Sequence, residues 1–226
     1  MIECPVCHND YSRIATHWAN GSCSISLTTQ QKQVAHGLLL GDGTLSQTGA
    51  NPRLQVACVE KEYLYELENI FGVLSAGVYE HRTAEEMAEE SEYSEDDFSD
   101  TYMWQSRRCS AFSDLTVWYS PEKIIPNDFE LSQEALTHWY CGDGTLHPQG
   151  HIRIAASGFY HIKDRVESLF TDSGLPAPSN WNTSQSSLVK QSASMVFTKS
   201  QTEELFSYMR APVSGFTYKW PDGRTS

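Results

Sequence analysis

Two aspartates lie in identical five-residue motifs, one in each half of this 226-residue chain. The motif is Gly-Asp-Gly-Thr-Leu, at residues 41–45 and 142–146, and each copy follows an apolar run that is expected to be helical. An aspartate at the carboxyl end of a helix meets the negative end of the helix dipole, which costs about 0.3–1 kcal/mol. If the two helices lie side by side, both carboxylates approach one point and stay ionised only with a cation between them. The pattern therefore indicates that Asp42 and Asp143 share a divalent metal site.

The sequence around the motifs favours a duplicated unit. A single Asp-Gly pair would be interpreted as a common turn, or as a helix that ends with a glycine, and not as a functional site. Two copies with similar flanks are harder to explain in that way. Each motif is followed by an alternating segment, which predicts a strand, and then by a segment of helical periodicity. The expected strands are residues 53–58 and 151–156, and the expected helices are residues 61–71 and 161–170.

These features resemble the single-chain, two-repeat LAGLIDADG homing endonucleases. Residues 35–43 and 136–144 occupy the nine-residue motif, and the similarity continues through Glu62-Tyr63-Leu64 and through Lys123-Ile124-Ile125-Pro126. The resemblance implies an α+β fold of two pseudo-symmetric αββαββα repeats. They would pack through the LAGLIDADG helices and carry saddle-shaped antiparallel sheets. The expected domains are a zinc-finger-like module at 1–26, a first repeat at 27–130 with an acidic insertion at 85–100, and a second repeat at 131–226.

The resemblance also implies the site residues. Asp42 and Asp143 would be catalytic and would bind Mg²⁺ or Mn²⁺, together with the backbone carbonyls of Gly41 and Gly142. Metal-assisted hydrolysis of a phosphodiester needs no serine, cysteine or histidine nucleophile, and magnesium prefers oxygen ligands. Family members carry a basic residue near the active centre, and the candidates are Lys123 and Lys219. A lysine before a proline-containing turn is also a common solvated loop residue, so both interpretations stay open.

The N-terminal segment predicts a second metal site. Cys4, Cys7, His17 and Cys23 have the spacing of a tetrahedral structural zinc site. Tyr11, Ile14 and Trp18 would pack over the metal, because so short a module cannot build a core alone. Such a finger could add DNA contacts. The alternative is a flexible N-terminus with unpaired thiols. No signal peptide or membrane-spanning run is evident, so we expect an intracellular, cytoplasmic protein in a reducing, nucleoid-associated setting.

The net charge of -13 is unusual for a DNA-binding protein, because phosphate contacts require basic residues. Much of the imbalance is local: residues 85–100 hold nine acids and no lysine or arginine. This composition predicts a disordered or loosely ordered surface insertion. The remaining acidity suggests a halophilic archaeon as the source.

Outward-facing polar residues on the expected strands are the candidates for DNA contact, by base edges or phosphates. They are Arg53, Gln55, Arg107, Arg108, Arg153 and Lys190. A pseudo-dimer in one chain would act as a monomer on double-stranded DNA with a long, asymmetric target site.

Three functions are compared. The first is a site-specific double-stranded DNA endonuclease, which retention of both aspartates and both lysines favours. The second is an RNA maturase or a non-cleaving DNA-binding protein on the same fold. The third is a calcium-binding protein, and it fails because neither motif offers further acids at alternating positions.

Overall fold

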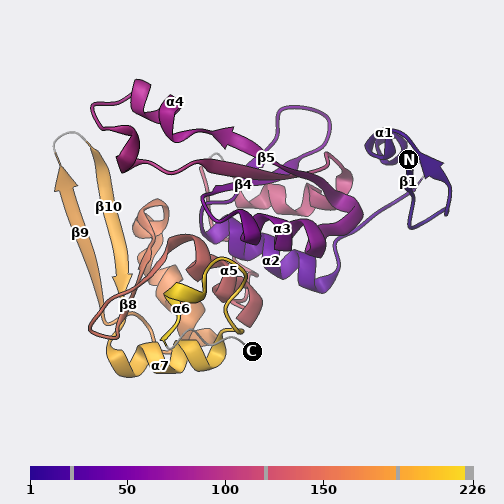
Figure 1. Ribbon diagram of the computed structural model, residues 1–226. Helices are drawn as coiled ribbons and strands as arrows, with labels where there is room; N and C mark the ends of the chain where they lie inside the picture. Colours follow the sequence, from indigo (N-terminus) through magenta and orange to yellow (C-terminus); the bar gives the residue numbers. More distant parts are fainter. Residues whose placement is uncertain (21–22, 120–121, 187–188, 222–226) are drawn as a thin grey trace. The chain divides into compact units, whose positions relative to one another are not determined.

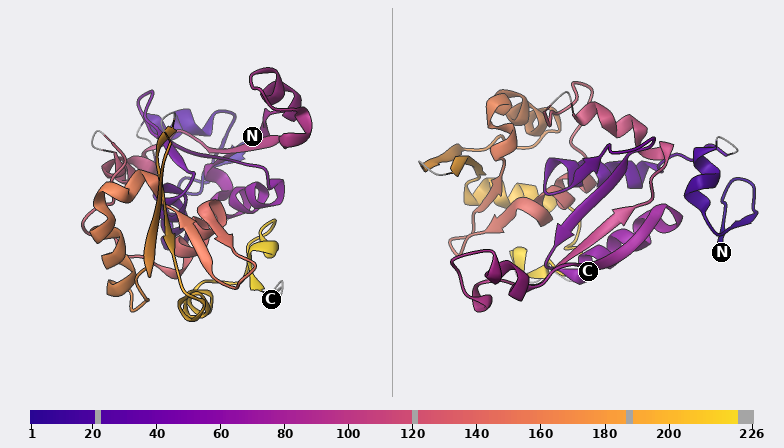
Figure 2. Two further views of the ribbon diagram at one scale, coloured as in Figure 1. Left: turned by 90° about the vertical axis from the view of Figure 1, so that its left-hand side faces the viewer. Right: turned by 90° about the horizontal axis from the view of Figure 1, so that it is seen from above.

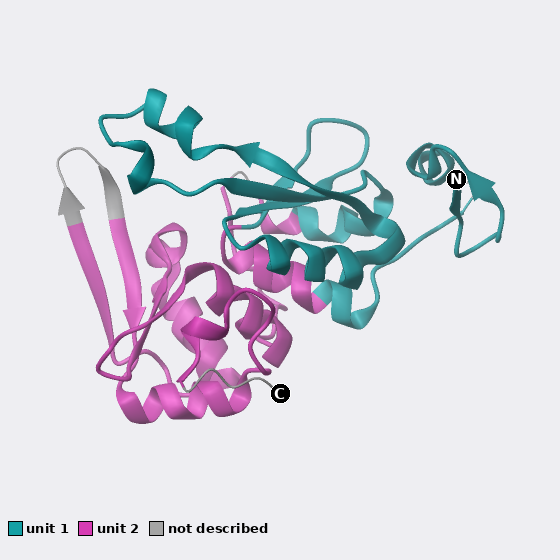
Figure 3. Ribbon diagram, viewed as in Figure 1, with its two compact units in different colours: residues 1–32, 43–116 teal, residues 33–42, 117–226 magenta. Residues whose placement is uncertain are grey.

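The computed structural model describes residues 1–20, 23–119, 122–186 and 189–221, without the side chains of residues 185–191, and it forms two compact units (Figure 3). Unit 1 comprises residues 1–32 and 43–116, and unit 2 comprises residues 33–42 and 117–226. Among the helices of the described residues, none has both the length and the apolar character of a membrane span.

Unit 1 contains a small N-terminal hairpin and a four-stranded sheet with its helix (Figure 1). Its elements are β1 (Ile2–Glu3), β2 (Asp10–Tyr11), α1 (Ile14–Ala19), the start of α2 (Thr29–Leu40), β3 (Thr44–Ser46), β4 (Arg53–Cys58), α3 (Lys61–Phe71), η1 (Gly72–Leu74), β5 (Ser75–Arg82), α4 (Ala84–Glu89), η2 (Glu95–Asp97), β6 (Thr101–Ser106) and most of η3 (Ser110–Trp118).

Unit 2 contains the rest of α2 and the second four-stranded sheet. Its further elements are α5 (Gln133–Asp143), β7 (Gly144–Leu146), β8 (Ile152–Ala155), η4 (Ser157–Ile162), α6 (Lys163–Asp172), β9 (Asn180–Ser186), β10 (Val189–Val196), α7 (Lys199–Tyr208) and η5 (Thr217–Lys219).

The two sheets have the same topology. The strand orders are β3-β4-β6-β5 and β7-β8-β10-β9, and every pairing is antiparallel. In each sheet, the first two strands form a hairpin directly after a motif helix. The predicted α+β fold of two repeats with antiparallel sheets is confirmed.

Alternation of apolar residues sets the buried face of each sheet. Leu54 and Val56 of β4 are buried, as are Ile152 and Ile154 of β8. In unit 1, α3 packs along β5 and β6, as can be followed in Figure 2. The predicted strand and helix at residues 53–58 and 61–71 have the bounds of β4 and α3.

The helix expected at residues 161–170 has different bounds. A 3-10 segment, η4, occupies Ser157–Ile162, and α6 begins only at Lys163. Phe159 within η4 is buried, so this tighter turn contributes to the core before the α-helix starts. Helical periodicity alone does not separate these two segments.

The acidic insertion has more local structure than its composition predicts. It forms α4 and η2 between β5 and β6. Thr83 and Ser94 each begin a capping box, in which the side chains of Glu86 and Asp97 accept from the cap backbone. Ala84 N donates to Asp100 Oδ1 at 2.9 Å, which closes the base of the insertion. Capping hydrogen bonds thus order a segment that buries little apolar surface.

Within unit 2, α2 and α5 approach each other at Gly37. A Cβ atom on Gly37 would lie 2.5 Å from the carbonyl oxygen of Ala135 and 2.7 Å from Cβ of His138. No residue with a side chain fits at such distances unless the helices separate.

We predict that Gly37→Ala destabilises the protein by about 1–3 kcal/mol, because overpacking outweighs the gain in helix propensity. Chemical denaturation would measure the loss. Gly158→Ala is the matched control, since its Cβ would meet nothing within 4 Å. Equal stability of the two variants would contradict the close approach of the helices.

Candidate active site

Both motif helices have defined starts. Thr28 and Gln31 form a capping box at α2, in which Gln31 N donates to Thr28 Oγ1 at 3.2 Å and Thr28 N donates to Gln31 Oε1 at 3.0 Å. At α5, the Ser132 hydroxyl accepts from Ala135 N at 3.1 Å. The caps fix where each helix begins, and hence which residues stand at its carboxyl end.

At those carboxyl ends, the two aspartates converge reciprocally. A Cβ on Gly41 would lie 3.3 Å from Asp143 Oδ2, and a Cβ on Gly142 would lie 3.5 Å from Asp42 Oδ2. Each carboxylate therefore rests against the glycine of the other motif. Asp42 is exposed and Asp143 is half-buried. The structure brings together the two aspartates that the duplicated motif singled out.

Each predicted lysine lies at one helix end. Lys123 Nζ donates to the carbonyl oxygen of Gly41 at 2.8 Å. Lys219 Nζ donates to the carbonyl oxygens of Cys141 at 2.6 Å and Gly142 at 3.4 Å. Both side chains are half-buried, so the interpretation as solvated loop lysines is wrong. A carbonyl oxygen has two lone pairs, so a lysine bond alone does not prevent Gly41 or Gly142 from contacting a metal.

The electrostatics of the site favour a bound cation. Burial and the neighbouring Asp42 carboxylate raise the pKa of Asp143 to about 7, against the opposing influence of Lys123 and Lys219. Burial lowers the pKa of Lys123, while the two aspartates oppose that shift. A carboxyl group with so high a pKa is one whose ionised form lacks sufficient compensation. Carboxylate oxygens are the donors that magnesium and manganese prefer, so the residues present fit a divalent metal.

Two residues of α5 and Arg210 form a polar network that the sequence motifs do not predict. His138 and Glu134 are buried on α5, and His138 Nε2 lies 3.8 Å from Glu134 Oε1. Arg210 Nη1 lies 2.7 Å from Glu134 Oε2. The spacing of four residues between Glu134 and His138 was a usable signal, whereas nothing local connects Arg210 to them.

Comparison with known proteins identifies the family of this chain. The model of the LAGLIDADG DNA endonuclease family matches residues 32–173, which is more than half of the chain. The chain belongs to the LAGLIDADG DNA endonuclease family. The matched residues include both motif aspartates.

Relatives of known structure share this LAGLIDADG fold. The homing endonuclease I-WcaI, solved bound to its DNA recognition sequence, superposes with a TM-score of 0.70 at 14% identity over 93% of this chain and 92% of that chain. The N-terminal LAGLIDADG domain of DUF199/WhiA superposes with a TM-score of 0.50 at 8% identity over 82% of this chain and 84% of that chain.

A relative in sequence is the uncharacterized protein MJ1098 of Methanocaldococcus jannaschii. It is 29% identical over 135 residues, which is 54% of this chain and 48% of that protein. The chain thus spans about half the length of the curated relative it matches.

Several candidate DNA contacts of this LAGLIDADG protein bond within unit 1. Arg53 Nη1 donates to Gln105 Oε1 at 2.5 Å, and Arg107 Nε donates to the carbonyl oxygen of Val73 at 3.1 Å. Arg107 and Arg108 were expected on a strand, but β6 ends at Ser106. Directly beyond the strand, Arg107 N donates to the carbonyl oxygen of Leu74, in η1, at 2.7 Å.

The guanidinium of Arg108 ties together the connection between β3 and β4. Arg108 Nη1 donates to the carbonyl oxygen of Asn51 at 3.2 Å, and Nη2 donates to Ser46 Oγ at 3.2 Å and to Thr48 Oγ1 at 3.1 Å. These bonds span about 60 residues of sequence, so the local pattern carries no signal for them. Arg108 therefore positions a hairpin of unit 1.

The remaining candidates differ in exposure. Gln55 is half-buried on β4, and Arg153 is exposed on β8. Lys190 falls in β10, but its side chain lies outside the described residues.

At the N-terminus, the structure brings Cys4, Cys7, His17 and Cys23 together.

We predict that Arg108→Met loosens the β3–β4 connection, because the stem is kept and the donors are lost. Hydrogen exchange of the amides at residues 47–52 should speed up. Arg153→Met, at an exposed arginine of β8, is the control and should leave those amides unchanged. Unchanged exchange in the Arg108 variant would mean that its hydrogen bonds do not hold the hairpin.

Proposed function

We propose that this protein is a site-specific endonuclease that hydrolyses both strands of a double-stranded DNA target with a divalent metal. The supporting observation is the reciprocal placement of Asp42 and Asp143, each against the glycine of the other motif. Membership of the LAGLIDADG DNA endonuclease family supports the substrate class. The target would be long and asymmetric, because the two repeats differ in sequence.

Asp42 and Asp143 would hold Mg²⁺ or Mn²⁺, with the carbonyl oxygens of Gly41 and Gly142 as further ligands. A bound divalent cation supplies charge neutralisation at phosphorus and a water activated for in-line attack. A site that both motifs build serves both strands, since each motif contributes one carboxylate.

Lys123 and Lys219 would supply positive charge from protein side chains beside the aspartates. Each ammonium group is held in place by a backbone carbonyl of a motif helix, so it loses little freedom when a phosphate arrives. Preorganised donors of this kind stabilise the charge that develops on the phosphate oxygens. Lys123 and Lys219 would thus orient the scissile phosphates and polarise water beside the aspartates.

Arg53, Gln55 and Arg153 would contribute to DNA contact from β4 and β8. Arg153 is exposed and needs no rearrangement to meet a phosphate or a base edge. Arg53 bonds Gln105, and such a pair can present a fixed pattern of donors and acceptors to a base. An RNA maturase or a non-cleaving DNA-binding protein remains the alternative that the experiments below would reveal.

We predict that Asp42→Asn and Asp143→Asn each retain DNA binding but reduce cleavage by orders of magnitude. Asparagine keeps the shape and removes the charge that holds the metal. The substrate is a supercoiled plasmid with the sequence formed by joining the genomic flanks of the reading frame, or a site selected from a random library. Nicked and linear products are scored with magnesium, beside a gel-shift measurement.

Asp164→Asn is the matched control, because it removes an exposed carboxylate from the first turn of α6, outside the site. It should cleave as the unchanged protein does. Linearisation at the unchanged rate by both site variants would refute the metal assignment. Binding without cleavage by the unchanged protein would favour the non-cleaving alternative, and selective RNA binding would favour the maturase.

We predict that replacing residues 84–99 with a short Gly-Ser turn strengthens DNA binding at low salt and leaves cleavage intact. The replacement removes acids that repel phosphate, and the difference should shrink as salt screens them. In a second variant, the acids of this segment are changed to Gln and Asn, which removes the charge and keeps the size. This variant should bind DNA as tightly as the shortened one. Lost cleavage in a folded variant would place the segment in the catalytic machinery.

A further inference from the structure

At the N-terminus, β1, β2, α1 and Cys23 bring three thiols and an imidazole together. β1 and β2 pair through Ile2↔Tyr11 and Glu3↔Asp10. The turn between them is closed by Cys4 N donating to the carbonyl oxygen of Asn9 at 2.9 Å, and by His8 N donating to the carbonyl oxygen of Cys4 at 2.9 Å. Cys4 and Cys7 therefore sit on one tight turn.

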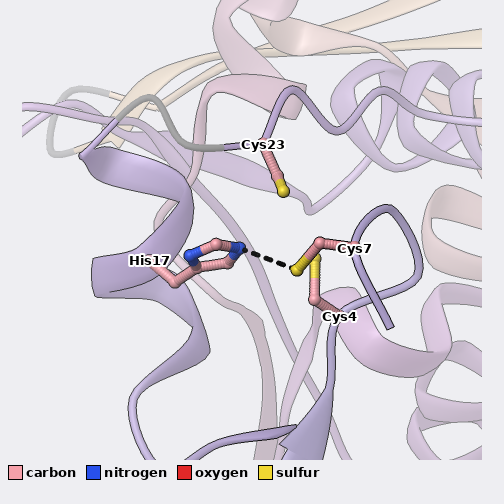
Figure 4. Close-up of side chains that lie close together, drawn as sticks. All are labelled: Cys4, Cys7, His17 and Cys23. Carbon is pink, nitrogen blue, oxygen red and sulfur yellow. Dashed lines mark hydrogen bonds between the residues drawn. The ribbon is translucent and has the colours of Figure 1, made fainter. Parts of the chain in front are cut away.

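Four possible ligand atoms converge from three segments. Figure 4 shows Cys4 and Cys7 on the turn, His17 on α1 and Cys23 beyond it, with the side chains directed toward one another. All four ligand atoms lie within 4.8 Å of one another, and Cys7 Sγ lies 3.6 Å from His17 Nε2. A tetrahedral site with metal–sulfur bonds of about 2.3 Å separates its ligands by about 3.8 Å. The cluster thus has nearly the dimensions of a zinc site.

The backbone supplies an independent observation. His8, the residue directly after Cys7, has a φ of 58°, and it is the one residue other than glycine with positive φ in the described part of the chain. That conformation is costly for a residue with a Cβ atom and persists where the surroundings impose it. The turn around Cys4 and Cys7 is held in this shape although His8 itself is exposed and buries nothing.

The module has little else to keep it folded. Among its described residues, the buried apolar side chains other than the cysteines are Ile14 and Trp18 of α1. So small a core does not stabilise an independent unit without a metal or a disulfide. Cys4, Cys7 and Cys23 form no disulfide. The Tyr11 ring stacks on His17 with ring centroids 3.8 Å apart, which orients the imidazole toward Cys7.

We propose that residues 1–23 are a zinc knuckle in which Cys4, Cys7, His17 and Cys23 bind one Zn²⁺, and that this ion holds the module in its folded shape. Three thiolates and one imidazole in a closed tetrahedral arrangement suit zinc in a structural role. The inference does not depend on nuclease activity, because its ligands lie in a different module from the motif aspartates.

Metal analysis of the purified full chain tests this directly. The unchanged protein should carry close to one zinc per chain, and Cys7→Ser and Cys23→Ser should each lose it. Cys58→Ser is the matched control, since Cys58 lies on β4 outside the cluster. Replacing zinc by cobalt should give the visible absorption of tetrahedral thiolate coordination. Absence of zinc from the unchanged protein, retention of zinc by both cluster variants, or a disulfide in the native protein would overturn the proposal.

A second pair of variants tests the imposed backbone shape. His8→Gly removes the Cβ that makes positive φ costly, so zinc should be released to a competing chelator several-fold more slowly. His8→Ala keeps the Cβ and loses the contact of His8 Nδ1 with Glu3 Oε1, at 3.0 Å. Zinc release from this variant should therefore be no slower than from the unchanged protein. Faster release from His8→Gly than from His8→Ala would contradict the knuckle, because the side chain and not the backbone would then matter.

Discussion

The close approach of α2 and α5 at Gly37 is the constraint on which the candidate active site depends. Because Gly37 has no Cβ, the backbone of α2 reaches the carbonyl oxygen of Ala135 in α5. Helices held this close end side by side, and each places an aspartate against the glycine of its neighbour. A side chain at Gly37 would push the helices apart and move the two carboxylates away from each other. The glycines of the motif therefore matter for geometry as much as the aspartates do for charge.

The close approach of the helices places two carboxylates at the carboxyl ends of α2 and α5. The negative ends of both helix dipoles lie at the same place. The carboxyl ends of both helices present carbonyl oxygens and carboxylates, and the pKa of Asp143 rises because burial and Asp42 disfavour its charged form. Lys123 and Lys219 offset part of this negative charge. Their ammonium groups donate hydrogen bonds to carbonyl oxygens at the ends of the two motif helices. A divalent cation would complete the compensation. The duplicated arrangement gives each lysine a backbone carbonyl acceptor at the end of one motif helix.

The repeats and the N-terminal module use different physical means to stay folded. Each repeat buries one face of a four-stranded sheet under helices, as Phe71 does against Trp104 with ring centroids 4.7 Å apart. The module has too few apolar residues for that, and a metal bound by four side chains is the alternative that small folds use. The acidic insertion uses a third means, since its helical turns depend on capping side chains and bury little. Surface acidity can therefore coexist with ordered local structure.

The sequence by itself determined the duplication, the pairing of the two aspartates, the Cys/His cluster at the N-terminus, and the strand and helix at β4 and α3. These features depend on short motifs and on alternation or helical periodicity. Only the tertiary structure decided the rest. Lys123 meets a carbonyl 82 residues away, and Arg108 meets a hydroxyl 62 residues away, so its guanidinium braces a hairpin of its own unit. The structure also divides the segment expected as one helix into η4, with its buried Phe159, and α6, which begins at Lys163. The physical reason is that periodicity reflects neighbours along the chain, whereas the acceptor that a long side chain meets is set by how distant segments pack.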